Sequence, residues 1–175
     1  MDFSQDHFAL FGLPRRYALD EAQLSRLYHE VQAQVHPDKF AHLSDAERRL
    51  AMQWTTRVNE AYQVLRAPLS RAKYLLKLAG VDVDQGRDMS GEFLMQQMEW
   101  REKVAEASTA GDIGRLEDFH DQLKRDVAKE YAKLARELEA YPEAAADGPV
   151  QLLRQLMFQE KLLHDIDDAL SAAEA

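Results

Sequence analysis

The sequence predicts an all-α protein composed of two helical modules. Its composition is 46% hydrophobic and 30% charged, with seven Gly and five Pro among 175 residues, which is typical of a helical globular protein. Apolar residues recur at three- and four-residue steps through most of the chain, as in amphipathic helices. Pro, Gly and helix-capping residues stand between these stretches, and no stretch shows the two-residue alternation of a strand.

The first long helix is predicted between Asp20 and Val35. Asp20 is a good N-cap residue and is followed three positions later by a glutamine, as in a capping box. The helix must end near Val35 because Pro37 lacks an amide hydrogen and disfavours helical geometry at His36. A short helix or turn precedes it, formed by an apolar cluster that a proline closes: Phe8, Leu10, Phe11, Leu13 and Pro14.

A second long helix is predicted from the capping box that Ser44 and Glu47 can form. Pro68 ends this helix because it cannot continue the hydrogen-bond pattern. Its apolar stripe consists of Leu50, Trp54, Val58, Ala61, Tyr62 and Leu65. A shorter helix over residues 70–79 follows, and Gly80 closes it because glycine suits the left-handed position after a helix end.

The chain divides into two modules joined by a short connection. Residues 1–80 form the first module, residues 81–90 a linker with several acidic residues and with Gly80 and Gly91 on either side, and residues 91–175 a three-helix bundle. The charges of the two parts differ: residues 1–79 contain 11 Lys and Arg against 9 Asp and Glu, whereas residues 80–175 contain 11 against 22. We expect modules with such different electrostatics to bind different partners.

Three helical patterns make up the predicted bundle. The first covers residues 91–110 and ends at Gly111. The second has the alternating three- and four-residue seam of a helical bundle, formed by Leu116, Phe119, Leu123, Val127, Tyr131, Leu134, Leu138 and Tyr141. The third follows a turn that runs through Gly148 and Pro149. Its apolar face consists of Leu152, Leu156, Leu163, Ile166 and Leu170.

Composition also limits the classes of function. The chain has no cysteine, which excludes disulfides, thiolate nucleophiles and Cys-bound zinc or iron–sulfur clusters. The formal net charge of -9 opposes binding to nucleic acid. No apolar run reaches the length of a membrane span, and the first residues are acidic and polar. We therefore expect a cytoplasmic monomer without a cofactor or metal, which binds neither nucleic acid nor membrane.

The tripeptide His36-Pro37-Asp38 lies between the two long predicted helices of the first module. Pro37 stiffens the turn, so an imidazole and a carboxylate are presented at an exposed tip at little entropic cost for binding. A plain turn, in which Asp38 caps the following backbone, is the simplest alternative. A metal site is a weaker one, because the candidate ligands straddle a helix end and lack helical spacing. These ligands are His29, His36, Asp38 and His42.

A helix, a His-Pro-Asp loop and a long helix within the first module resemble the J domain of DnaJ-type co-chaperones, over residues 1–79. The resemblance implies that the tripeptide binds a DnaK-family ATPase, where its aspartate pairs with an arginine, and that Lys39 adds charge beside it. The preceding helix of J domains is commonly rich in Lys and Arg, but here it offers only Arg26. Docking charge is therefore expected from further basic residues, namely Lys39, Arg48, Arg49 and Arg57.

The helix over residues 91–110 has apolar residues on two sides. At about 100° per residue, one face consists of Phe93, Trp100, Val104 and Ala107, and we expect it to be buried. The opposite side carries Leu94, Met95 and Met98 among the carboxylates Glu99, Glu102 and Glu106. In the last helix Phe158 lies about a third of a turn from the apolar stripe. An exposed apolar strip edged with carboxylates indicates a docking surface; the alternative is that a neighbouring helix covers it.

Segments from nearly the whole chain are similar to the HscB family of co-chaperones. They are Phe8-Ala9-Leu10-Phe11-Gly12-Leu13-Pro14, His36-Pro37-Asp38-Lys39-Phe40, Arg66-Ala67-Pro68, Arg71-Ala72-Lys73-Tyr74-Leu75-Leu76 and Phe93-Leu94-Met95. The resemblance implies that the bundle binds the iron–sulfur scaffold protein IscU. The implied surface consists of Leu94, Met95, Met98, Glu99, Glu102, Glu106 and Phe158, with Met98 where a leucine is common.

The same resemblance implies a mechanism in which the chain is not itself an enzyme. The first module stimulates the ATPase HscA while the bundle holds IscU, so that HscA clamps the scaffold and assists cluster transfer. The Cys-rich zinc motif of eukaryotic relatives is absent, which predicts a bacterial protein.

Two alternatives to this function remain open. One is a J-domain protein that delivers a different client. The other is a hydrolase or metal enzyme, which would need convergent acid, base or ligand residues. The sequence offers no nucleophile motif that would supply them.

Overall fold

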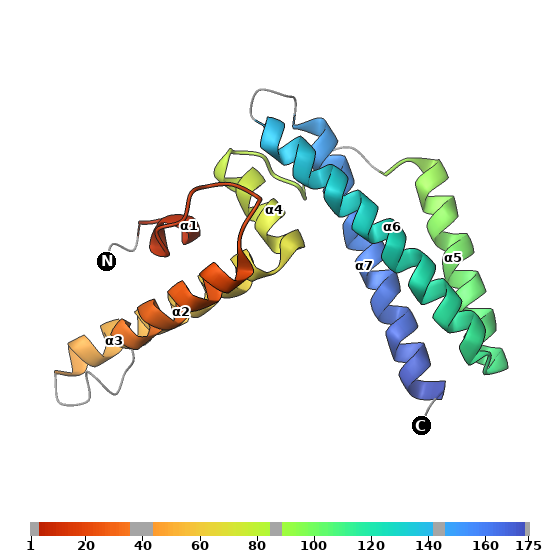
Figure 1. Ribbon diagram of the computed structural model, residues 1–175, viewed down its shortest axis with the longest axis horizontal. Coiled ribbons are helices and arrows are strands. Elements are labelled where there is room, and N and C mark those ends of the chain that lie inside the picture. Colours follow the sequence, from red (N-terminus) through yellow and green to blue (C-terminus); the bar gives the residue numbers. More distant parts are fainter. Residues whose placement is uncertain (1–3, 36–43, 85–88, 142–145, 174–175) are drawn as a thin grey trace. The chain divides into compact units, whose positions relative to one another are not determined.

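The computed structural model describes residues 4–35, 44–84, 89–141 and 146–173, and its regular secondary structure within these residues is entirely helical, as predicted. The helices are α1 (His7–Leu10), α2 (Glu21–Val35), α3 (Asp45–Arg66), α4 (Pro68–Leu78), α5 (Gly91–Ala110), α6 (Ile113–Ala140) and α7 (Asp147–Ala173) (Figure 1). They form two compact units, Met1–Leu78 and Ala79–Ala175, which are described separately.

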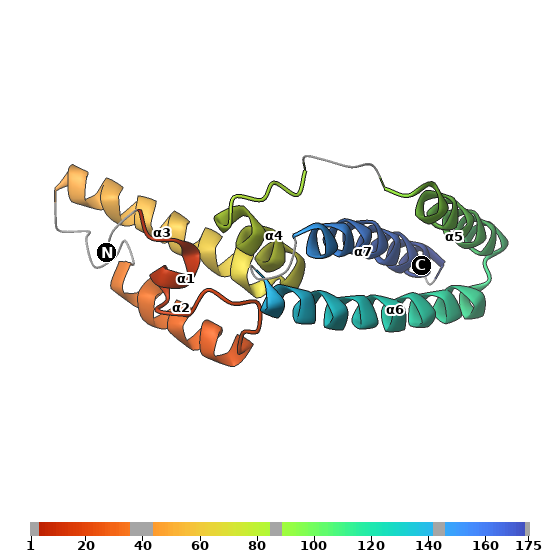
Figure 2. The ribbon, with the colours of Figure 1, turned by 90° about the horizontal axis from the view of Figure 1, so that it is seen from above.

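Helices α2 and α3 lie side by side and run in opposite directions in the first unit (Figures 1 and 2). The predicted N-terminal signals are both confirmed. Asp20 Oδ1 accepts hydrogen bonds from the amides of Ala22 and Gln23, at 2.9 and 3.2 Å. Ser44 and Glu47 form the reciprocal capping box at the start of α3. Both helices of the hairpin therefore begin where local chain chemistry dictates.

The core of this unit combines α2 and α3 with the apolar cluster around α1. Its buried members are Phe8, Leu10, Phe11, Leu24, Val35, Trp54, Val58, Ala61 and Leu65. The prediction for Leu50 is wrong, because this side chain is 47% exposed and Ala51 is buried instead. The physical reason is that all described residues from Ser44 to Leu50 are exposed, so the first turns of α3 extend past the packed core.

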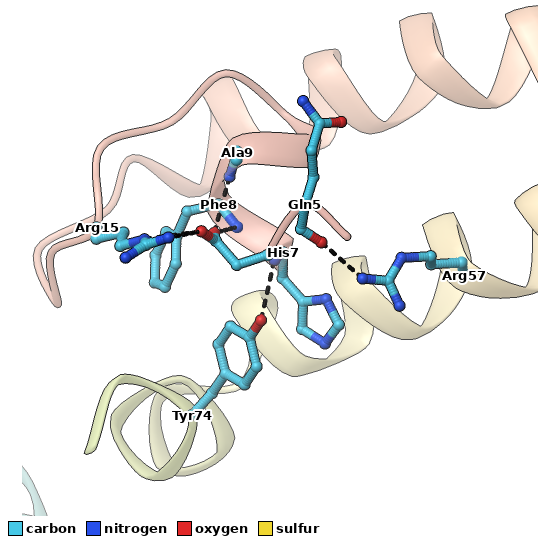
Figure 3. Close-up of polar contacts among 8 residues, drawn as sticks. Gln5, His7, Phe8, Ala9, Arg15, Arg57 and Tyr74 are labelled. Carbon is cyan, nitrogen blue, oxygen red and sulfur yellow. Dashed lines mark hydrogen bonds and ion pairs between the residues drawn. The ribbon is translucent and has the colours of Figure 1, made fainter. Parts of the chain in front are cut away.

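The short helix α1 is capped by Asp6 and anchored to two other helices (Figure 3). The amide of His7 donates to the Tyr74 hydroxyl at 3.0 Å, and the two rings stack with centroids 4.2 Å apart. Arg57 of α3 donates from Nη2 to the Gln5 carbonyl at 2.6 Å. The opening segment is thus held by polar contacts to α3 and α4 in addition to its apolar residues.

The carboxylate of Asp6 accepts bonds from two amides and from a guanidinium. Its Oδ1 lies 2.9 Å from the Phe8 nitrogen and 3.0 Å from the Ala9 nitrogen, and its Oδ2 lies 2.7 Å from Arg15 Nε (Figure 3). Burial raises the pKa of Asp6, but the bonds from Ala9 and Arg15 outweigh it and hold this pKa below its ordinary value.

We expect the first unit to lose stability in mild acid because of His7. Burial lowers the pKa of its imidazole below the ordinary 6.5, and Nδ1 is buried without a hydrogen-bond partner among the described residues. The unfolded chain then binds more protons than the folded chain as the pH falls through about 6.5. The free energy of unfolding should therefore decrease between about pH 7.5 and about pH 5.5.

Urea denaturation followed by the fluorescence of Trp54 measures this effect. The chain has two Trp, and the substitution Trp100→Phe leaves Trp54 as the only one, buried in the first unit. His7→Phe keeps an aromatic ring against Tyr74 but cannot take up a proton. In this variant the free energy of unfolding should depend less on pH than in the protein that keeps His7. An equal pH dependence in the two proteins would contradict the assignment to His7.

The corner between α3 and α4 depends on a buried arginine. Arg71 donates from Nη1 to the Leu65 carbonyl at 2.8 Å, near the end of α3, and its guanidinium lies over the Tyr17 ring at 4.9 Å. Helix α4 begins at Pro68, two residues earlier than predicted, because proline is tolerated in the first helical turn, where its missing N–H has no partner.

The second unit is the predicted three-helix bundle. Helix α5 has the predicted bounds, with Ser90 as its N-cap and Gly111 in the left-handed conformation (φ 64°) as its C-cap. The predicted turn through Gly148 and Pro149 is wrong, since both residues lie in the first turn of α7. A Cβ on Gly148 would meet the carboxylate end of the flexible Glu137 side chain of α6, which would have to move aside.

Helix α7 buries more residues than predicted because it packs against both α5 and α6. Leu153 and Leu162 are fully buried, whereas the predicted Leu163 is only partly buried. A helix that touches two neighbours needs an apolar face wider than one stripe. Within the segment predicted as a linker, Val83 is buried and its carbonyl accepts a hydrogen bond from Arg154 Nε at 2.8 Å.

Candidate functional site

The first candidate surface is the end of the α2–α3 hairpin. Helix α2 ends at Val35, and α3 follows the cap at Ser44. The predicted chaperone-binding residues His36, Pro37, Asp38 and Lys39 lie outside the described residues. Arg26, predicted with them, is exposed on α2.

Contacts between side chains of α2 and α3 join the two arms of this hairpin. Tyr28 and Tyr62 stack with centroids 4.1 Å apart, and the Tyr28 hydroxyl donates to Asn59 Oδ1 at 3.0 Å. Thr55 Oγ1 lies 2.9 Å from the Ala51 carbonyl of its own helix and 3.1 Å from the carbonyl of Val35, the last residue of α2. These contacts fix the point at which the chain leaves α2 toward the tripeptide.

The basic residues proposed to assist docking have different environments. Arg57 is partly buried and donates to the Gln5 carbonyl. This acceptor is neutral and leaves the positive charge in place, so the contribution of Arg57 to docking stays a prediction. Arg48 is exposed and pairs with Asp45 on the same helix. Arg49 is exposed on the first turns of α3.

We expect Thr55→Val to destabilise the first unit by about 1 kcal/mol, the usual net value of one hydrogen bond. Valine has nearly the same shape but cannot donate to the Val35 carbonyl or to the Ala51 carbonyl of its own helix. The matched control is Thr56→Val, because Thr56 makes the same kind of bond within its own helix, to the Met52 carbonyl at 3.0 Å. Urea denaturation of both variants measures the difference, and equal losses would show that the bond to α2 contributes nothing.

The second candidate surface is the docking strip, defined as Leu94, Met95, Met98, Glu99, Glu102, Glu106 and Phe158. Its three apolar α5 residues are exposed by 41%, 66% and 63% in that order, and Phe158 of α7 is 37% exposed. The three glutamates are exposed on α5. The prediction that no neighbouring helix covers these residues is confirmed.

The buried face of α5 explains why the strip points outward. Phe93, Val104 and Ala107 are buried against the bundle, and Trp100 meets Phe119 of α6 edge-on at 5.6 Å. At about 100° per residue this face directs the strip residues of α5 away from α6 and α7. Phe158 of α7 meets Phe93 of α5, the neighbour of Leu94, edge-on, with ring centroids 5.9 Å apart.

The carboxylates of the docking strip have different surroundings. Glu106 pairs with Arg115 across the α5–α6 turn at 3.8 Å, with both side chains largely exposed, so the pair contributes little stability. Glu102 and Glu106 also line a shallow, open hollow on α5 together with Ala105, Thr109 and Ala110. The surface as a whole therefore offers apolar contact area beside acceptor oxygens, which suits a protein partner that carries basic groups.

Other kinds of site were also sought in the part of the chain that the structure describes. These residues contain no group of three His, Cys, Asp or Glu side chains that could hold a metal ion. No helix among them has the length and apolar character needed to cross a membrane.

Known proteins resemble this chain along nearly its whole length. Residues 89–167 match the family model described as the HSCB C-terminal oligomerisation domain. The "Co-chaperone protein HscB homolog" of Azoarcus sp. (strain BH72) is 53% identical, over 99% of this chain and 98% of the relative. That of Aromatoleum aromaticum (strain DSM 19018 / LMG 30748 / EbN1) is 51% identical over the same shares.

Two solved structures share the fold. The chaperone HscB from Vibrio cholerae superposes with a TM-score of 0.82 at 33% identity, covering 94% of this chain and 96% of that one. The human co-chaperone protein HscB gives 0.86 at 29% identity, covering 95% of this chain and 83% of that one.

The N-terminal helical hairpin and the C-terminal three-helix bundle define a J-domain co-chaperone. With relatives about half identical over their full length, the chain belongs to the HscB family of co-chaperones, which serve iron–sulfur cluster assembly.

Proposed function

We propose that this protein, in the bacterial cytoplasm, binds an IscU-type iron–sulfur scaffold and brings it to an HscA-type ATPase of the DnaK family. The docking strip holds the scaffold. The tripeptide at residues 36–38, with Lys39 and Arg26, engages the ATPase and stimulates hydrolysis of ATP. The groups that react with ATP belong to the ATPase, so this protein acts as a regulator and needs no cofactor. It acts as a monomer.

The observation that carries the scaffold-binding proposal is the exposure of Leu94, Met95 and Met98 on α5 and of Phe158 on α7, whose ring contacts Phe93 of α5. Single exposed apolar residues are common, but four that belong to one surface favour a binding site. A rim of carboxylates in a part of the chain with twice as many acidic as basic residues favours a partner with basic groups. A scaffold with an apolar patch edged by Lys or Arg fits both properties.

A steady-state ATPase assay tests both halves of the proposal. We expect this protein to raise the rate of an HscA-type ATPase, and to raise it further when an IscU-type scaffold is present. If this protein stimulates the ATPase but the scaffold neither binds to it nor changes the rate, the protein is a J-domain protein with a different client. No stimulation under any condition would exclude the proposed role.

A further inference from the structure

The docking strip crosses the contact between two helices. Leu94, Met95 and Met98 belong to α5, whereas Phe158 belongs to α7 and touches Phe93 of α5. A partner that covers the strip therefore touches both helices at once. Any looseness between α5 and α7 changes the surface that the partner meets.

Helix α5 is the least firmly packed of the three. Helices α6 and α7 pack against each other more extensively than either packs against α5, and they lie together along much of their length (Figure 1). Of the 20 residues in α5, only Phe93, Gln97, Val104 and Ala107 are buried. The shorter α5 therefore depends on a narrow contact with the α6–α7 pair.

One of these four buried residues, Gln97, brings a polar amide into the contact between α5 and the other two helices. Gln97 is only 5% exposed, and its Oε1 is buried without a hydrogen-bond partner among the described residues. Gln159 of α7, next to Phe158, also has a buried Oε1 without such a partner. A buried amide oxygen that gives up water without gaining a donor opposes packing. Gln97 lies one helical turn after Phe93, and Gln159 directly follows Phe158, so both amides are close in sequence to the two rings that contact each other.

We propose that α5 separates locally from α7 in the unbound protein, and that scaffold binding fastens the two helices together. Gln97 is the positioning residue. Its amide oxygen without a hydrogen-bond donor lowers the free energy with which α5 packs against the bundle in the unbound protein. The inference rests on the proposed function for the identity of the partner. Its physical basis is that a ligand bound only by the closed arrangement shifts the population toward it.

Amide hydrogen exchange of the full chain, alone and with an IscU-type scaffold, tests this inference. In the unbound protein, α5 amides should exchange faster than those in the middle of α6 and α7. The scaffold should slow exchange in α5 more than in α6. Exchange in α5 as slow as in α6 in the unbound protein would overturn the inference.

The variant Gln97→Met removes the amide and keeps the length of the side chain. We expect it to slow α5 exchange in the unbound protein by about tenfold, without a comparable change in α6. Scaffold affinity should rise by severalfold, because α5 is already packed against the bundle before binding and the entropic cost of ordering it on binding is smaller. Gln96→Met, at an exposed position on the same helix, is the control and should change neither quantity.

The outcomes separate the two proposals. Faster α5 exchange or lower stability in Gln97→Met would mean that the amide is satisfied, and would overturn the role of Gln97. If the wild-type protein fails to bind the scaffold in calorimetry, the proposed function fails. The exchange of α5 in the unbound wild-type protein and in Gln97→Met still decides whether the helix opens.

Discussion

Replacing Asp38 by Asn should abolish stimulation of the HscA-type ATPase. The change removes one negative charge while keeping the size of the side chain, and the J-domain resemblance implies an arginine on the ATPase as its partner. Truncating one member of a buried, hydrogen-bonded charge pair costs about 2–5 kcal/mol, so the complex should weaken at least about 30-fold. Steady-state ATP hydrolysis, measured over a range of concentrations of this protein, gives the result.

Two controls make this prediction specific. Asp45→Asn makes the same chemical change on a largely exposed side chain of the adjoining helix, and it should keep full stimulation. Binding of the Asp38→Asn variant to the scaffold, followed by calorimetry, should equal that of the wild-type protein, because the docking strip belongs to the other unit. Normal stimulation by the Asp38→Asn variant would falsify the proposed J-domain mechanism.

Changing Leu94, Met95 and Phe158 together to Ala should weaken scaffold binding by about 2 kcal/mol or more, which is about 30-fold. These side chains supply much of the apolar area of the strip, and buried apolar anchors dominate the affinity of most protein interfaces. Titration calorimetry with an IscU-type scaffold measures the loss. Stimulation of the ATPase by the variant alone should persist.

Because Phe158 also contacts Phe93, the triple variant can loosen the bundle itself. The double variant Met95→Ala and Met98→Ala avoids this problem, since both side chains are about two-thirds exposed. It should weaken binding while leaving the helix content and the thermal midpoint unchanged. Met52→Ala changes a methionine of similar exposure in the first unit and should leave affinity unchanged. Unaltered affinity in both strip variants would refute the strip as the scaffold site.

Several of the helix ends follow from local chemistry and were therefore predictable, although the starts of α4 and α7 were not. The capping box at Ser44, the left-handed Gly111 and the break before Pro37 each act on neighbouring backbone groups. The exposure of Leu94, Met95 and Met98 was predictable for a related reason. Once Phe93 and Val104 mark the buried face, the helical repeat assigns the remaining positions.

Contacts between residues far apart in the chain could not be predicted in this way. Nothing near Thr55 in sequence indicates the Val35 carbonyl, 20 residues away, and nothing near Arg57 indicates the Gln5 carbonyl, 52 residues away. Gln97 is polar and would be placed on a solvated face by composition alone, yet the packing of α5 buries it.

The sequence by itself determined which segments form helices, where they stop and which face of α5 stays apolar and exposed, because these properties depend on interactions within a few residues. Only the tertiary structure decided which polar groups pair across helices and which, such as the amide of Gln97, are buried without a partner. The physical reason is that hydrogen-bond satisfaction depends on the neighbours that packing brings within reach, and a linear pattern does not specify them.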